Sequence, residues 1–346
     1  MSTIGKAFAR RLLCAVVLFC SLGACKKLEQ LKESGTTPGA ADSAAAPVAS
    51  AASAAQNEEE ADAQMGEKIS GYVDCLNRAS PNVFSSRDRY LSWVDEKKGP
   101  TGKDRYVYGL YQLNSDESCL SAITKASPLK PSLPDVDGAG AAYGTALRAL
   151  APLIKTAYLY YDQDNYKDDK MARGKAMHAP LMAAFHAFGD ASKALEGQIS
   201  KLNDVLAARR RGRLAKDPAQ RLRYLVTEAE IQGKSLVNAA DVKSIQDLDD
   251  PRFTAFLGDF EKTLGDLDTY QGAHKPEVDK VNNFSSFYQA GMDYLKSAKD
   301  LMRRKRDKKD FKKESGNPES IDGHPAQVTK KYNHFVEESN RLRFES

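Results

Sequence analysis

The sequence predicts an all-α protein, a bundle of long antiparallel helices behind a disordered N-terminal tether. Three observations support this. Apolar residues recur at alternating spacings of three and four through most of the chain after residue 140. Asp-Pro pairs mark two helix starts, and no alternating apolar and polar run is long enough for a sheet. A spacing of three and four places apolar side chains on one stripe of a helix, which a bundle buries.

Residues 1–24 form a predicted signal peptide that takes no part in the fold. Lys6, Arg10 and Arg11 precede an apolar stretch over residues 12–22, too short to span a bilayer. The stretch runs into Leu-Gly-Ala-Cys, which resembles a bacterial lipoprotein signal with Cys25 as the acylated first mature residue. The formal net charge of +4 includes three charges from this segment, so the mature chain is almost neutral. Secretion and near-neutrality argue against a nucleic-acid partner.

Acyl chains such as palmitate on Cys25 would anchor the protein permanently, since one chain alone gives only marginal membrane binding. The alternative is an ordinary secretory signal with an incidental cysteine. Lys26 stands where an Asp would resemble an inner-membrane retention signal. We therefore expect the outer membrane, with the protein facing the periplasm and surface exposure as an alternative. Residues 25–64 are rich in Ala, Ser, Gly and Pro and predict a disordered tether.

Cys75 and Cys119 are the two cysteines that follow Cys25. In an oxidising compartment such a pair predicts one disulfide, which would contribute about 4 kcal/mol in the chain-entropy model. Free thiols and a metal pair are the alternatives. No other His or Cys stands at ligand spacing from either cysteine, so we predict no metal there.

The folded part is predicted as one helical domain over residues 65–346. Its first helices carry apolar residues on one side, with Pro81 expected to end the first; they are Gln64–Arg78, Ser86–Lys97 and Leu113–Ser127. The run Tyr106–Tyr111 has no partner strand nearby and is interpreted as a lead-in to the third helix. Three prolines between residues 128 and 134 predict a connecting loop.

The later helices have the strongest periodicity. Their apolar stripes span Tyr143–Tyr161, Leu181–Leu206, Leu222–Ala240, Phe253–Leu267 and Val281–Met302, and a last helix is expected over Pro325–Leu342. Asp217-Pro218 and Asp250-Pro251 each pair an N-cap residue with proline at the first helical position. These elements complete the predicted bundle.

The stretch from Tyr158 to Phe188, between two of these helices, concentrates chemistry-bearing side chains. Its four aspartates do not fit a calcium-binding EF-hand loop, because Lys167 stands where Gly is needed and Arg173 where the bidentate Glu belongs. The candidate residues for a pocket, or for a purely structural junction, are Tyr161, Tyr166, Asp168, Asp169, Lys175 and His178. In the structural interpretation an aspartate caps the next helix or pairs with Lys175. In the pocket interpretation the same groups bind a sugar or peptide.

No catalytic set is recognisable, and we predict no enzymatic activity and no cofactor. The chain lacks G-x-S-x-G, H-E-x-x-H and a paired Cys and His. A di-iron bundle needs Glu-x-x-His on each of two helices, and none is present. His334 and Glu337 form a lone His-x-x-Glu that loosely resembles the iron-linked motif of imelysin-like helical lipoproteins. Two basic runs, at residues 209–213 and 303–313, are interpreted as solvated helix ends, with anionic lipid or cell-wall polymer as alternative contacts.

The central motif resembles the YiiG-like family of bacterial lipoproteins, a domain of unknown function. The residues that carry the resemblance are Tyr160-Tyr161, Tyr166-Lys167-Asp168-Asp169, Gly174-Lys175, His178, Leu181 and Phe185, with Tyr72, Cys75 and Asn77 in the opening helix. The resemblance covers residues 68–342 and implies a helical, membrane-tethered envelope protein. It implies no catalytic residue.

Three functional hypotheses follow. The first is a non-enzymatic, lipid-anchored periplasmic protein that binds or scaffolds an envelope component, either a protein or a cell-wall polymer. The second is a metal- or haem-linked helical binding lipoprotein that uses His178, His186 and His334. The third, an envelope hydrolase, needs a buried acid/base pair that the sequence does not reveal.

Overall fold

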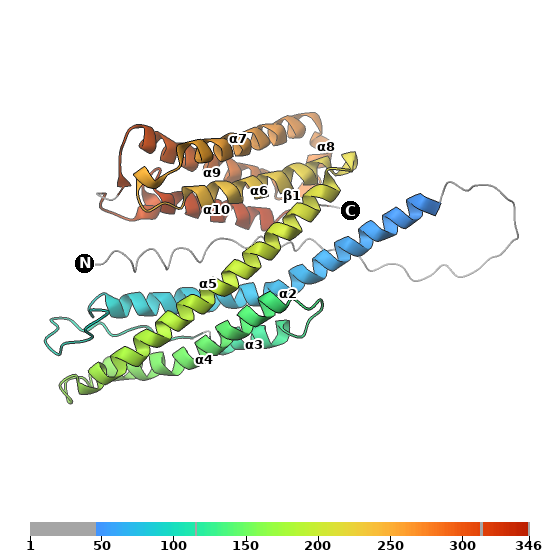
Figure 1. Ribbon diagram of the computed structural model, residues 1–346. Coiled ribbons are helices and arrows are strands. Elements are labelled where there is room, and N and C mark those ends of the chain that lie inside the picture. Colours follow the sequence, from blue (N-terminus) through green and yellow to red (C-terminus); the bar gives the residue numbers. More distant parts are fainter. Residues whose placement is uncertain (1–45, 115, 312–313, 345–346) are drawn as a thin grey trace, which may run out of the picture. The chain divides into compact units, whose positions relative to one another are not determined.

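The computed structural model describes residues 46–114, 116–311 and 314–344 (Figure 1). The all-α prediction is confirmed, because helices dominate the described residues and the sheet among them has only two short strands. None of the helices in these ranges is long and apolar enough to span a membrane. The predicted signal peptide, Cys25 and the tether up to residue 45 lie outside the described residues.

The described chain divides into two compact units. Unit 1 comprises residues 67–204, and unit 2 comprises residues 46–66 and 205–344. The prediction of one domain over residues 65–346 stays a prediction. Unit 1 contains α3, α4 and parts of two long helices that continue into unit 2; the bounds are α2 (Ala46–Leu91), α3 (Asp116–Ala126), α4 (Pro134–Asp162) and α5 (Ala172–Leu214).

Unit 2 packs four helices around an aromatic core: α6 (Arg221–Ala240), α7 (Asp250–Ala273), α9 (Phe284–Arg306) and α10 (Pro325–Asn340). In Figure 1 they are the orange and red elements. Short elements join them: η2 (Pro218–Gln220), η3 (Ile245–Asp247), α8 (Lys275–Val278) and η5 (Pro318–Ser320). An antiparallel pair, β1 (Val281–Asn282) and β2 (Arg343–Phe344), lies beside them. The predicted apolar stripe began at Val281, but Val281 belongs to β1 and α9 starts at Phe284. The last helix was expected to reach Leu342, but α10 ends two residues earlier, at Asn340.

The predicted stripes are the buried faces of their helices. In α4, Tyr143, Leu147 and Ile154 are completely buried. In unit 2, Phe260 and Phe335 stack edge to face at 5.6 Å between ring centroids. Apolar burial of this kind stabilises a helix bundle by roughly 1.5–3 kcal/mol for each large side chain. The spacing of three and four therefore identified the core.

The first predicted helix is wrong at both ends. It was expected from Gln64 to Arg78, but α2 starts at Ala46 and runs through Pro81 to Leu91, merging with the second predicted helix. Residues 46–64, assigned to the tether, are therefore helical; alanine is the strongest helix former, which explains the early start. At Pro81 the ring removes one backbone donor, and the Asn82 side chain donates to the Arg78 carbonyl at 3.0 Å. Packing on both sides of the proline outweighs its local cost.

Two smaller expectations also need correction. Residues 106–111 form no helical lead-in and carry no regular structure, and α3 starts only at Asp116. Asp217 caps η2 as predicted, with its side chain accepting from the Ala219 N–H at 3.0 Å. At α7 the cap is Asp249, one residue earlier than expected, and Pro251 occupies the second helical position. At either position the proline costs no hydrogen bond, because the first N–H groups of a helix have no partner within it.

Candidate functional site

The junction between α4 and α5 is a tight turn with several residues in the left-handed backbone conformation and a closely packed glycine. Asp164, Lys170 and Met171 adopt left-handed φ values of 56°, 54° and 69°. Gly174, in the first turn of α5, is buried, and a Cβ there would lie 2.8 Å from the Tyr161 hydroxyl. Only glycine lets α5 approach the end of α4 this closely, which explains the Gly-Lys pair in the motif.

Asp169 caps the start of α5. Its carboxylate accepts from the backbone N–H groups of Ala172 at 3.2 Å and Arg173 at 3.0 Å. It also accepts from the Tyr160 hydroxyl at 2.7 Å. The Tyr160 contact and the backbone donors hold the Asp169 pKa below its usual range. Burial, helped by the neighbouring carboxylate, raises the pKa of Tyr160 to about 12.

Two of the predicted residues stay at the surface. Asp168 and Lys175 are both exposed. Lys175 forms no ion pair with Asp168, Asp169 or any other residue in the described part of the chain. Of the two roles proposed for the aspartates, capping is therefore the one that the geometry realises, through Asp169.

Tyr161 lies at the centre of an aromatic cluster. Its ring contacts Tyr160 at 4.9 Å, Trp93 at 5.2 Å and Tyr90 at 6.1 Å between centroids. The Tyr166 ring lies on the side of the turn, 6.3 Å from Tyr161 between centroids, and burial together with the Asp164 carboxylate raises the Tyr166 pKa. The buried Tyr161 hydroxyl makes no hydrogen bond of ordinary geometry, although the Tyr90 hydroxyl lies near it. Burial, reinforced by that neighbour, raises the Tyr161 pKa.

His178 is buried and uses both ring nitrogens. Nε2 lies 2.9 Å from the Glu96 carbonyl oxygen, which can only accept, so Nε2 donates. Nδ1 lies 3.0 Å from the Tyr90 hydroxyl and accepts its proton in the neutral tautomer. Gly99, with φ +73°, packs on the ring, where a Cβ would lie 2.9 Å from His178 Cδ2. With both nitrogens engaged, the ring ties α5 to the end of α2.

The other two histidines of the metal hypothesis stand in different settings. His186 is exposed, with Nε2 3.2 Å from a Glu96 carboxylate oxygen. His334 on α10 is half exposed, and its Nδ1 lies 3.8 Å from Glu337. Among the residues that the structure describes, no three His, Cys, Asp or Glu side chains are grouped to hold a metal ion. The described residues therefore offer no metal-ion site to the second hypothesis, and its haem form stays a prediction.

Sequence reasoning missed a buried lysine network in unit 1. The Lys68 side chain is only 1% exposed, and Nζ donates to Asp137 Oδ2 at 2.7 Å. It also contacts the carbonyl oxygens of Ser127, Leu129 and Pro131 at 3.2, 2.9 and 3.1 Å. The loop between α3 and α4 thus wraps around one ammonium group. Lys68 stands inside the predicted first helix, but no local pattern pairs it with a residue 69 positions away.

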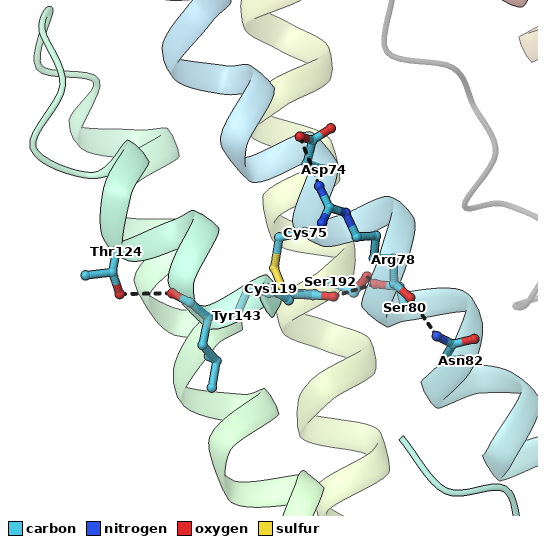
Figure 2. Close-up of a disulfide and its surroundings, with 10 residues drawn as sticks. Asp74, Cys75, Arg78, Ser80, Asn82, Cys119, Thr124, Tyr143 and Ser192 are labelled. Carbon is cyan, nitrogen blue, oxygen red and sulfur yellow. Dashed lines mark hydrogen bonds and ion pairs between the residues drawn. A yellow bond between two sulfur atoms is a disulfide. The ribbon is translucent and has the colours of Figure 1, made fainter. Parts of the chain in front are cut away.

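The disulfide joins α2 to α3. Cys75 and Cys119 are bonded, with their Cα atoms 4.3 Å apart (Figure 2). A buried polar cluster follows along α2, where Ser80 lies 2.7 Å from the Tyr143 hydroxyl and 3.1 Å from Ser192 Oγ. These three side chains are fully buried, so the cluster joins α2, α4 and α5 internally and offers no access to a substrate.

The arginines of the first basic run are all ion-paired, and Arg209 and Arg211 keep 54% and 52% of their side chains exposed. The run lies within α5, not after it, and Arg209 and Arg213 bind Asp62 at 3.0 and 2.6 Å. Arg211 pairs with Glu228, and Arg210 lies 3.7 Å from Glu230. Glu228 and Glu230 are buried, so these arginines compensate buried charge.

The second basic run also makes internal contacts. Arg304 pairs with Glu314 at 2.6 Å, and Lys305 donates to the carbonyls of Gln246 and Leu248 at 3.1 and 3.0 Å. Arg303 pairs with Asp300 on the preceding turn. Residues 312 and 313 lie outside the described residues. In the described part of this run, Lys305 therefore connects the end of α9 to the loop before α7.

Residues 63–341 match the family described as a protein of unknown function, DUF3829. The chain belongs to this family. It is similar to the uncharacterized protein YiiG of Escherichia coli strain K12, with 29% identity over 287 residues, 80% of this chain and 79% of that protein. The resemblance to a YiiG-like family is thus confirmed. No solved structure matches the chain.

Proposed function

We propose that this DUF3829 protein is a lipid-anchored periplasmic protein that binds or scaffolds an envelope component without catalysing a reaction. The observation that carries the proposal is the Leu-Gly-Ala-Cys sequence at residues 22–25 behind a charged and apolar leader. The disulfide between Cys75 and Cys119 supports it, because disulfides persist in oxidising compartments.

The non-enzymatic part of the proposal rests on where the chemistry-bearing groups lie. Glu196 has a pKa raised by burial, as a general acid needs, but its hydroxyl partner Ser192 belongs to the sealed serine–tyrosine cluster. Both ring nitrogens of His178 are engaged in hydrogen bonds, one with Tyr90 and one with the Glu96 carbonyl. A catalytic group must reach a substrate atom, and the buried His178, with both ring nitrogens engaged, is not placed to do so.

The test is metabolic labelling with radioactive palmitate, followed by membrane fractionation. The wild-type protein should carry label and sediment with outer-membrane vesicles. A Cys25→Ser variant should be unlabelled and soluble. Label on neither protein, or an unchanged membrane fraction for Cys25→Ser, would contradict the lipid anchor. Crosslinking in intact envelopes, with Cys25→Ser as control, then tests the binding role.

A further inference from the structure

Three tyrosines stand exposed on one short segment of unit 1. Tyr106, Tyr108 and Tyr111 are 55%, 51% and 50% exposed, although tyrosine rings usually bury most of their surface. They belong to residues 105–113, here called the tyrosine segment, which has no helix, strand or turn after its first residue. Packing of the protein core does not explain why three large aromatic rings are exposed to solvent within nine residues.

The tyrosine segment is held in place by side chains of α2 and by Trp93, two residues after α2, rather than by backbone pairing. Arg89 donates to the Tyr108 carbonyl at 2.8 Å, Trp93 to that of Gly109 at 3.0 Å and Ser86 to that of Tyr111 at 2.7 Å. Gly109, with φ +62°, packs against Tyr161. The segment is therefore positioned before any partner arrives, which lowers the entropic cost of binding.

The rings form an ordered platform. Tyr106 and Tyr108 are nearly parallel, with an interplanar angle of 14° and centroids 6.0 Å apart. The Arg105 guanidinium lies 5.1 Å from the Tyr106 ring, and that of Arg89 lies 4.6 Å from the Tyr111 ring. Offset parallel rings at this distance leave ring surface open to solvent. The platform thus combines aromatic faces with cationic groups.

Hydrogen-bond donors accompany the platform. The backbone N–H groups of residues 105–113 donate to no residue in the described part of the chain. The three phenol hydroxyls likewise make no hydrogen bond to a described residue. A partner for this surface must supply flat apolar faces and acceptors side by side.

We propose that the tyrosine segment binds the glycan strand of the cell wall. A sugar ring presents C–H groups on its faces and hydroxyl and carbonyl acceptors at its edge. The faces suit the parallel rings of Tyr106 and Tyr108, and the acceptors suit the unpaired N–H groups and the phenols. Arg105 and the exposed Lys103 suit the carboxylates of the attached peptides. This inference rests on the proposed periplasmic location and names the envelope component.

The experiment is cosedimentation of the full-length protein, purified in detergent, with protein-free peptidoglycan sacculi. Tyr106→Ala/Tyr108→Ala should weaken binding about tenfold or more, because exposed aromatic anchors dominate interfaces of this kind. Tyr106→Phe/Tyr108→Phe keeps the rings and should retain most of the affinity. Tyr158→Ala, a half-buried tyrosine on α4 outside the segment, is the matched control. Unchanged Trp93 fluorescence would show that the segment stays in place, since Trp93 contacts Gly109.

Two soluble probes separate glycan from peptide. Oligomers of N-acetylglucosamine should compete with sacculi, and synthetic stem peptides should not. Competition by the stem peptides alone would overturn the inference and indicate that the unpaired backbone recognises an extended peptide. Equal binding by wild type and the double alanine variant, or no binding to sacculi, would also overturn it. Palmitate labelling and crosslinking would still test the anchored, scaffolding function independently.

Discussion

Replacing Lys68 by methionine tests whether the buried ammonium organises unit 1. Methionine keeps most of the side-chain volume but removes the charge. The change leaves the Asp137 carboxylate and the carbonyls of Ser127, Leu129 and Pro131 without their common donor. Asp137 keeps the Tyr72 hydroxyl at 2.7 Å and the Leu133 N–H at 3.0 Å, so it is not stripped of partners.

The magnitude follows from burial. Breaking a buried ion pair by removing one partner costs about 3–5 kcal/mol, because the remaining charge is left uncompensated. The Asp137 side chain is 20% exposed, and water can partly replace the lysine. We therefore expect the lower end, about 3 kcal/mol, in the free energy of unfolding of unit 1.

The assay is urea unfolding followed by tryptophan fluorescence. Trp93 is the single tryptophan of the chain and belongs to unit 1, so its signal reports the unit that contains Lys68. Lys155→Met is the control, since Lys155 lies exposed on α4 in the same unit and its replacement should cost below about 0.5 kcal/mol. A loss for Lys68→Met of under about 1 kcal/mol would refute the reasoning.

The same variant has a pH signature. Burial alone would raise the Asp137 pKa, but hydrogen bonds from Lys68, Tyr72 and Leu133 outweigh it and hold the pKa below its ordinary value of 3.8. The ionised carboxylate then stabilises the folded state above the unfolded pKa, and this stabilisation is lost as pH falls through the folded pKa. The stability gap between wild type and Lys68→Met should therefore narrow below about pH 4. A gap that stays constant down to pH 2 would show that the charge plays no part.

Three further predictions use other contacts of unit 1. Gly99→Ala should cost about 1–3 kcal/mol in urea unfolding, because φ is +73° and the new methyl would lie 2.9 Å from His178. Replacing Cys75 and Cys119 by alanine should lower the free energy of unfolding by about 2–4 kcal/mol, measured without reductant. Glu196→Gln should stabilise the protein at pH 8 and not at pH 4. Burial raises the Glu196 pKa, so that carboxyl favours the fold only while protonated and loses this contribution as pH rises through the folded pKa.

Each of these predictions has a control. Gly197→Ala, at a helical glycine with no atom within 4 Å of the new methyl, should stabilise α5 slightly, in contrast to Gly99→Ala. The double alanine variant at Cys75 and Cys119 should match reduced wild type, and a difference would point to packing of the sulfur atoms. For Glu196→Gln, destabilisation at pH 8 would mean that the ionised carboxylate is stabilising and would contradict the raised pKa.

The aromatic junction shows how far local sequence reasoning reaches. The stretch around Tyr161 was singled out by its composition, and Asp169 was among the proposed caps. The partners that define the site could not be predicted: Tyr90 lies in the last turn of α2, Trp93 follows α2, and the Glu96 carbonyl lies 82 residues before His178. No local pattern pairs residues that are brought together only when two helices pack.

Features that depend on neighbouring residues could be predicted from the sequence. The positions of the later helices, their buried stripes, the cap at Asp217 and the family motif follow from short-range spacing and side-chain chemistry. The tertiary structure alone decided what depends on long-range packing. It carried α2 through Pro81, paired the arginines of α5 with buried carboxylates, enclosed Lys68 and left the tyrosines of residues 105–113 in water. The physical reason is that periodicity fixes which face of a helix is apolar, whereas the pairing of distant groups is fixed only by the packing of the whole core.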